Sequence, residues 1–185
     1  MTVDVVHGDG PAAGDEHGDA RHGEIALVPV DLRLRARVLA LGPHPHQRRY
    51  SGVPSDTLPP AERDPAQYPV AIVEDGNPVG FFALQGGPGA GRLIRGRQDM
   101  LLRAFFVDAT RQGRGIAPRA LLELPGYVRA LDPAIRRVVL TVNVDNGPAI
   151  RTYLRSGFVD TGELFHGGIY GPQHVFALSV PPAAA

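Results

Sequence analysis

The alternation of apolar and polar positions divides this chain into strand-like and helix-like segments. Runs rich in β-branched and aromatic residues, which favour strands, cover residues 24–30, 70–74, 79–84, 101–107, 138–142, 158–163 and 174–180. Apolar residues recur at helical spacing over residues 32–41, 115–124 and 147–156. The pattern therefore predicts strands and helices mixed along one chain.

Capping and turn residues set the expected ends of several segments. Asp31 and Asn146 are placed to cap the starts of helices, and Gly157 is placed to end one. The sequence Asp75-Gly76-Asn77-Pro78 predicts a hairpin turn between two strands.

Proline shapes two other stretches. Pro125-Gly126 removes a backbone donor, so we expect the helix that starts at Gly115 to kink or end near Leu124 and residues 127–131 to continue helically on a new axis. The segment from Pro43 to Pro69 is rich in proline and too long for a plain connection. We expect a long loop there, which either covers a substrate or is only a stiffened surface segment.

The segment Leu101–Ala117 combines a buried strand with a glycine-rich turn. Its apolar half suits a strand covered on both faces, and Gly113 and Gly115 then remove side chains where the backbone must approach a ligand closely. A strand that leads into such a helix start presents free N–H groups and favours phosphate. The P-loop is excluded because Ile116-Ala117 stands where Lys-Ser/Thr is needed. The dinucleotide fingerprint is excluded because Pro118 replaces its third small residue.

Two motifs resemble the GNAT superfamily of N-acetyltransferases. Residues 112–117, QGRGIA, resemble its Q/R-x-x-G-x-G/A signature, in which successive amides hold the pyrophosphate of coenzyme A. Residues 146–158, NGPAIRTYLRSGF, resemble its second hallmark, N-x-x-A-x-x-x-Y-x-x-x-G-F. The resemblance spans roughly residues 24–180 and is greatest to bacterial small-amine and polyamine acetyltransferases. It implies an α/β fold with a mixed, mostly antiparallel sheet of about seven strands and helices on both faces.

The resemblance also implies roles for particular residues. Acetyl-CoA would be the cosubstrate, and backbone amides of the central strand would hold its pantetheine arm and polarise the thioester. Tyr153 would be the general acid for the departing thiolate, after direct attack by the amine in a ternary complex. Tyr50 and Ser51, with Gly52, would line the acceptor pocket. The residues expected to contact the cofactor are Phe106, Val107, Gln112, Gly113, Arg114, Gly115, Ile116, Ala117 and Asn146.

The sequence does not single out one residue as the general base. Many relatives place a carboxylate on the central strand, where this chain has Arg103 and Ala104. That difference counts against a strongly cationic acceptor. The remaining candidates for the base are Glu74, Asp99, His166 and His174.

Composition limits the expected number of domains, the partners and the location of the protein, but it indicates no further functional site. The chain has 185 residues and is 43% hydrophobic, and we expect a disordered tail over residues 1–23 and a single domain over residues 24–181. Nineteen basic residues, all arginine, balance 19 acidic ones, so nucleic acid is not an expected partner. Cysteine and long apolar runs are both absent, so we expect a cytoplasmic protein that neither contains disulfides nor enters a membrane. No metal site is expected, because His7, His17 and His22 fit no fixed ligand geometry.

The sequence therefore predicts an acetyl-CoA-dependent N-acetyltransferase that acts on a primary amine of a small molecule. Two alternatives stay open: an enzyme that acetylates amines of proteins or peptides, and a domain that binds acetyl-CoA as a sensor. The oligomeric state also stays open, a homodimer included.

Overall fold

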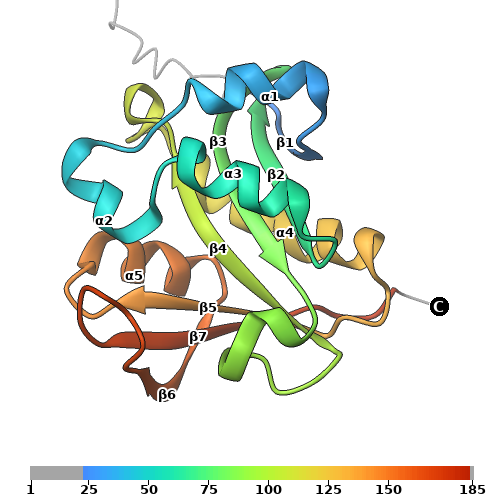
Figure 1. The fold of residues 1–185 in the computed structure, drawn as a ribbon, viewed down its shortest axis with the longest axis vertical. Helices are drawn as coiled ribbons and strands as arrows, with labels where there is room; N and C mark the ends of the chain where they lie inside the picture. Colours follow the sequence, from blue (N-terminus) through green and yellow to red (C-terminus); the bar gives the residue numbers. More distant parts are fainter. Residues whose placement is uncertain (1–22, 184–185) are drawn as a thin grey trace, which may run out of the picture.

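The computed structural model describes residues 23–183, in which seven strands form one sheet with helices on both faces (Figure 1). The strand order is β1-β2-β3-β4-β5-β7-β6, and every neighbouring pair is antiparallel except β4 with β5. The predicted fold class is therefore confirmed. The strands are β1 (Ile25–Pro29), β2 (Gln67–Glu74), β3 (Asn77–Gln85), β4 (Asp99–Val107), β5 (Arg137–Asn143), β6 (Val159–Phe165) and β7 (Gln173–Ser179).

Apart from Gly23, the tail expected over residues 1–23 lies outside the described residues, and so do the three histidines at positions 7, 17 and 22. Between residues 23 and 183, no helix is both long enough and apolar enough to cross a membrane. The helices are α1 (Leu32–Leu39), α2 (Arg48–Ser51), α3 (Pro54–Arg63), α4 (Ile116–Leu131) and α5 (Gly147–Arg155), with short 3-10 turns η1 (Pro45–Gln47), η2 (Pro88–Leu93) and η3 (Ala109–Arg111).

The predicted helix caps and hairpin turn are confirmed. The Asp31 carboxylate accepts from the backbone N–H of Arg33 at 3.0 Å and of Leu34 at 2.8 Å, at the start of α1. The Asn146 side chain accepts from the third residue of α5 at 3.3 Å. Asp75 and Gly76 have φ of 49° and 75°, as a two-residue turn between β2 and β3 requires.

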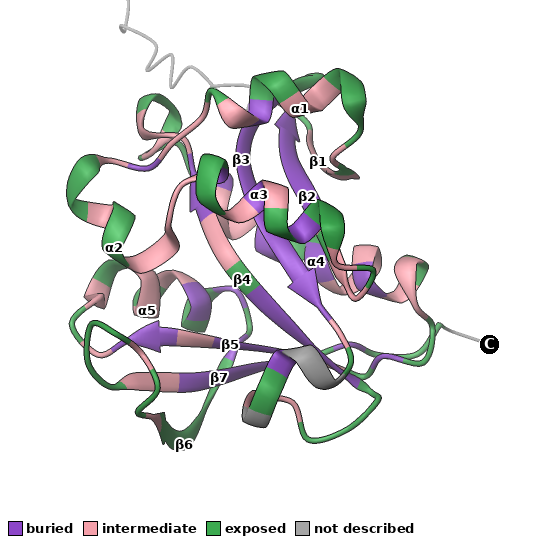
Figure 2. Cartoon of the chain, viewed as in Figure 1, coloured by how far each residue is buried: buried purple, intermediate pink, exposed green. Residues whose placement is uncertain are grey.

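Two buried clusters hold the helices against opposite faces of the sheet. One buries the inner side of α4 with Phe82, Phe158 and Phe176. The other buries α1 and α3 against Phe81 and Phe106. Figure 2 shows the central strands largely buried, whereas β6 is mostly exposed and α2 is part exposed and part intermediate. The central strands are thus covered on both sides, which agrees with their nearly continuous apolar sequence.

Two expectations based on proline need correction. An end of the helix near Leu124, one of the two outcomes expected there, is wrong, because α4 continues through Pro125 to Leu131, and residues 127–131 are helical as expected. Its buried positions, from Ala120 to Val128, form one stripe across the proline, so packing offsets the missing hydrogen bond. The stretch from Pro43 to Pro69 is largely helical rather than a loop, since it holds η1, α2 and α3. In α3 the proline at the first position is tolerated, and Leu58 and Ala61 bury the helix on the sheet.

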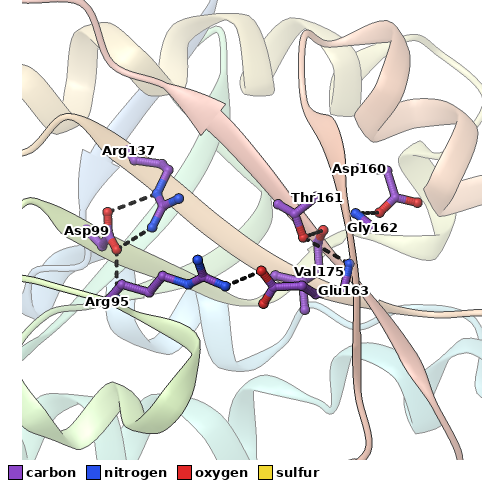
Figure 3. A network of polar contacts seen from close by, with 8 residues as sticks. All are labelled: Arg95, Asp99, Arg137, Asp160, Thr161, Gly162, Glu163 and Val175. Atoms are coloured by element: carbon purple, nitrogen blue, oxygen red, sulfur yellow. Dashed lines mark hydrogen bonds and ion pairs between the residues drawn. The ribbon is translucent and has the colours of Figure 1, made fainter.

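An ion-pair network closes one end of the junction between β4 and β5 (Figure 3). The Asp99 carboxylate, nearly buried, accepts two hydrogen bonds from the Arg137 guanidinium at 2.9 and 2.6 Å. It also accepts from the backbone N–H of Arg95 at 2.8 Å, and the guanidinium of Arg95 pairs with Glu163 on β6. The network therefore joins the starts of β4 and β5 to the edge strand.

Removing the Arg137 charge should destabilise the protein at neutral pH. The loss of stability should be much smaller in acid. Burial opposes ionisation of Asp99, but the hydrogen bonds from Arg137 and Arg95 outweigh it and lower the pKa of this carboxyl. Because the folded pKa is depressed, the stabilisation is complete above about pH 4 and is lost as the pH falls through the folded pKa. We expect Arg137→Met to cost about 1–3 kcal/mol of unfolding free energy at pH 7 in urea titrations, and less below about pH 3.

Arg35→Met is the matched control, because Arg35 pairs with Glu62 at 2.8 Å on the surface between α1 and α3. Exposed pairs contribute little, so this variant should lose much less stability than Arg137→Met. Equal losses, or a loss for Arg137→Met that stays constant with pH, would show that the buried pair does not hold this junction.

Candidate active site

The sheet opens between β4 and β5. These strands pair over Asp99–Leu101 and Arg137–Val139 only, and Figure 1 shows them diverging beyond that point toward α2 and α5. The pairing of β4 with β3 shifts register between Phe81 and Ala83, and Ala104 opposite has a φ of 54°. Such a bulge bends the strand, and a left-handed alanine costs about 1 kcal/mol that surrounding structure must offset. The opening is thus built into the backbone of β4.

Strand alternation decides which backbone groups face this opening. The N–H of Asp108 donates to the Val79 carbonyl on β3 at 2.8 Å. Residues two apart point their N–H and carbonyl groups to the same side, so those of Phe106 also face β3. The N–H groups of Phe105 and Val107 face the opening instead. Of the two predicted backbone contacts, the geometry therefore favours Val107, and it adds Phe105, which the sequence motif did not single out.

Tyr153 spans the opening from α5. Its ring packs edge-on against Phe105 of β4 at 6.1 Å, Phe158 at 5.5 Å and Phe176 of β7 at 6.5 Å between centroids. Burial raises the pKa of the Tyr153 hydroxyl, which therefore stays protonated at neutral pH. The Tyr153 hydroxyl has no hydrogen-bond partner among the described residues. Since no fully buried polar side-chain atom there lacks a partner, this hydroxyl keeps some access to solvent. Tyr153 can therefore donate a proton at the opening.

The predicted phosphate turn lies where β4 leads into α4. Gly113 and Gly115 have φ of 78° and 68°, and Gly115 is the N-cap of α4 with no side-chain cap. In the described part of the chain, the N–H groups of residues 113–117 donate to no other protein group. A Cβ added at either glycine would meet nothing within 4 Å. An open surface of free N–H groups at a helix start fits a pyrophosphate.

A buried carboxylate holds the first turn of α4 in place. Glu74, at the end of β2, is 7% exposed and lies 3.2 Å from the Arg119 guanidinium and 3.7 Å from that of Arg114. Arg119 also donates to the Gly23 carbonyl at 2.7 Å, so it is held by the protein. Arg114 is half exposed and only loosely paired. Of the two arginines, Arg114 is the one free to turn toward a bound phosphate.

A groove of about 470 Å³ lies between η1–α2 and the start of α5. Tyr50 lines it, with its hydroxyl 2.6 Å from an Arg49 nitrogen and its ring 4.6 Å from the Arg49 guanidinium carbon. Ser51 does not line it and donates instead to the Gly52 carbonyl at 3.3 Å. The lining residues are Pro45, His46, Gln47, Arg49, Tyr50, Asp145, Asn146 and Pro148. The structure thus brings Tyr50 and Asn146 together in one groove.

None of the four base candidates lines this groove. Glu74 and Asp99 are held by arginines, and Asp99 lies at the closed end of the junction. His166 is exposed between β6 and β7, and His174 lies 3.3 Å from the Asp160 carboxylate on β6.

The groove itself offers two other proton acceptors, the His46 imidazole and the Asp145 carboxylate. Neither residue belongs to the sequence motifs described above. The available signals were the polar run around His46, inside the proline-rich segment, and the carboxylate directly before Asn146.

Residues 35–158 match the acetyltransferase (GNAT) family. The uncharacterized N-acetyltransferase YbbJ of Bacillus subtilis (strain 168) is 33% identical over 116 residues, which cover 62% of this chain and 72% of that protein. A crystal structure of the aminoglycoside acetyltransferase AAC(6')-Ib with coenzyme A has a TM-score of 0.69 at 16% identity, over 84% of this chain and 95% of the other. The spermidine N-acetyltransferase from Vibrio cholerae, with coenzyme A and spermine, has a TM-score of 0.64 at 15% identity, over 84% and 95%.

Proposed function

Because the chain belongs to the acetyltransferase (GNAT) family, we propose that it transfers the acetyl group of acetyl-CoA to a primary amine of a small molecule. The observation that carries the proposal is the opening between β4 and β5, which Tyr153 spans beside the free N-terminus of α4. An acetyl-CoA-dependent N-acetyltransferase needs a phosphate cradle, a slot for an extended thioester and a proton donor. All three would meet at this junction.

The cofactor would lie along the opening. The amides of Gly113 to Ala117 would hold its pyrophosphate, with Arg114 adding positive charge. The amides of Phe105 and Val107 would bind the pantetheine arm and polarise the thioester carbonyl. Gln112 and Asn146 would mainly hold the backbone around the cofactor in place, since the Gln112 amide donates to the Val107 carbonyl at 3.0 Å and Asn146 caps α5.

Acetyl-CoA supplies the acetyl group as a thioester, which a neutral amine attacks directly when both substrates are held together. Tyr153 would donate its hydroxyl proton toward the leaving sulfur, and its raised pKa keeps that proton in place beforehand. His46 or Asp145 would take the proton that the amine must lose. No residue needs to be acetylated on the way, in keeping with a chain that has no cysteine.

The size of the groove favours a small acceptor. A volume of about 470 Å³ falls within the range of about 300–1,000 Å³ that is usual for small-molecule sites. The similar structures named above were solved with coenzyme A and, in one of them, spermine. These neighbours support a small amine as the acceptor class.

Thiol release from acetyl-CoA tests the proposal across polyamines, aminoglycosides, amino acids and peptide N-termini. Binding of acetyl-CoA is established first by calorimetry, and the protein contributes no thiol of its own. Turnover confined to one class of small amine would support the proposal and identify the acceptor. Turnover of peptides alone would replace it with a protein substrate, and bound acetyl-CoA without any turnover would indicate a sensor.

A further inference from the structure

Two glutamine side chains from distant parts of the chain form a reciprocal amide pair. Gln47 donates from Nε2 to the Gln112 Oε1 at 3.1 Å, and Gln112 donates from Nε2 to the Gln47 Oε1 at 2.7 Å. The Gln112 Nε2 also donates to the Val107 carbonyl at 3.0 Å. Both side chains are half-buried, and each amide supplies the other with one donor and one acceptor.

The pair joins the two halves of the site. Gln112 directly precedes the phosphate turn, whereas Gln47 belongs to η1 and lines the groove. The Gln47 Oε1 also accepts from the backbone N–H of His44 at 3.2 Å, which extends the connection along the segment. Nearer α1, the same segment is anchored by the Asp108 carboxylate, which accepts from the Gly42 N–H at 2.9 Å. Movement of the phosphate turn would therefore be transmitted to the groove wall through Gln47.

We propose that Gln47 is a positioning residue that couples the cofactor site to the acceptor groove, so that a filled phosphate turn favours acceptor binding. This inference rests on the proposed function, because it requires coenzyme A at residues 113–117. Two left-handed glycines make the empty turn costly to order. Once a ligand has fixed the turn and Gln112 with it, ordering residues 43–52 costs less, and the coupling is reciprocal.

Hydrogen exchange with coenzyme A as the probe tests this coupling without a known acceptor. In the unaltered protein, saturating coenzyme A should slow hydrogen exchange at residues 113–117. It should also slow exchange at residues 43–52, by about tenfold, which lies in the lower part of the usual range for coupled sites. Gln47→Leu should keep the protection of residues 113–117 and lose that of residues 43–52. Arg48→Leu is the matched control, because Arg48 is exposed and does not line the groove, and it should keep both.

The outcomes separate this inference from the proposed function. If residues 43–52 remain protected in Gln47→Leu, the coupling does not run through Gln47. The coupling is also overturned if, in the unaltered protein, coenzyme A protects residues 113–117 but not residues 43–52. Absence of protection at residues 113–117 overturns the placement of the cofactor, and the coupling with it. Once an acceptor is known, Gln47→Leu should raise the KM for that acceptor about tenfold and leave the affinity for acetyl-CoA unchanged.

Discussion

Replacing Tyr153 with phenylalanine should lower kcat by about 10²- to 10⁴-fold, the usual contribution of a positioned general acid. The ring contacts with Phe105, Phe158 and Phe176 do not involve the hydroxyl, so phenylalanine preserves the packing across the opening. Acetyl-CoA should therefore bind with nearly unchanged affinity. Thiol release measures kcat, and calorimetry measures the affinity for acetyl-CoA.

Tyr127→Phe is the matched control for this experiment. Tyr127 is a half-buried tyrosine of α4 whose pKa is also raised by burial, but its ring makes none of the aromatic contacts that hold Tyr153 across the opening. Its hydroxyl can be removed without touching the opening between β4 and β5. A Tyr153→Phe enzyme that lost affinity and turnover by the same factor would refute the general-acid role and leave Tyr153 as a packing residue.

The raised pKa of Tyr153 also has a consequence for the pH profile. A general acid must be protonated to act, so its rate falls as the pH rises through its pKa. Because burial moves that pKa above the reference value of about 10, Tyr153 should cause no alkaline loss of kcat below about pH 10. An earlier fall would identify a different acid.

The sequence predicts best where a local rule acts alone. The caps at Asp31 and Asn146 and the turn at Asp75-Gly76 each depend on a few neighbouring atoms, and the structure has all three. The glycines before α4 likewise adopt the left-handed conformation that the motif requires. In such places the geometry is fixed by residue type, so a short window of sequence contains enough information.

The sequence predicts poorly where tertiary contacts decide. Pro125 should interrupt a helix on local grounds, but the buried stripe of α4 continues past it. Helical spacing places Leu154 on the same face of α5 as Ile150 and Tyr153, yet Leu154 is 46% exposed. The bulge at Ala104 and the alternation that turns Val107 to the opening depend on pairing with β3. Likewise, His46 and Asp145 are far apart in the sequence, and only the tertiary fold brings them to one groove.

Gly115→Val should weaken acetyl-CoA binding by about 10- to 100-fold, because losing one hydrogen bond to a charged group costs about 1.5–3 kcal/mol. Gly115 has a φ of 68°, which a β-branched residue adopts only with strain. Valine would rotate the backbone toward negative φ and turn the N–H groups of the phosphate turn away from the ligand. Its Cβ meets nothing within 4 Å, so the fold itself should survive, at a cost of about 1–2 kcal/mol. Calorimetry gives the affinity, and thermal unfolding gives the stability.

Gly126→Val places the same side chain on the same helix and separates the two effects. Gly126 lies inside α4, its φ is not positive, and an added Cβ there also meets nothing within 4 Å. Valine is a better helix former than glycine, so this variant should be at least as stable as the parent and bind acetyl-CoA normally. If Gly115→Val bound as tightly as Gly126→Val, the amides of this turn would not hold the cofactor. The pyrophosphate would then need another cradle, and the half-exposed Arg114 would lose its proposed role beside it.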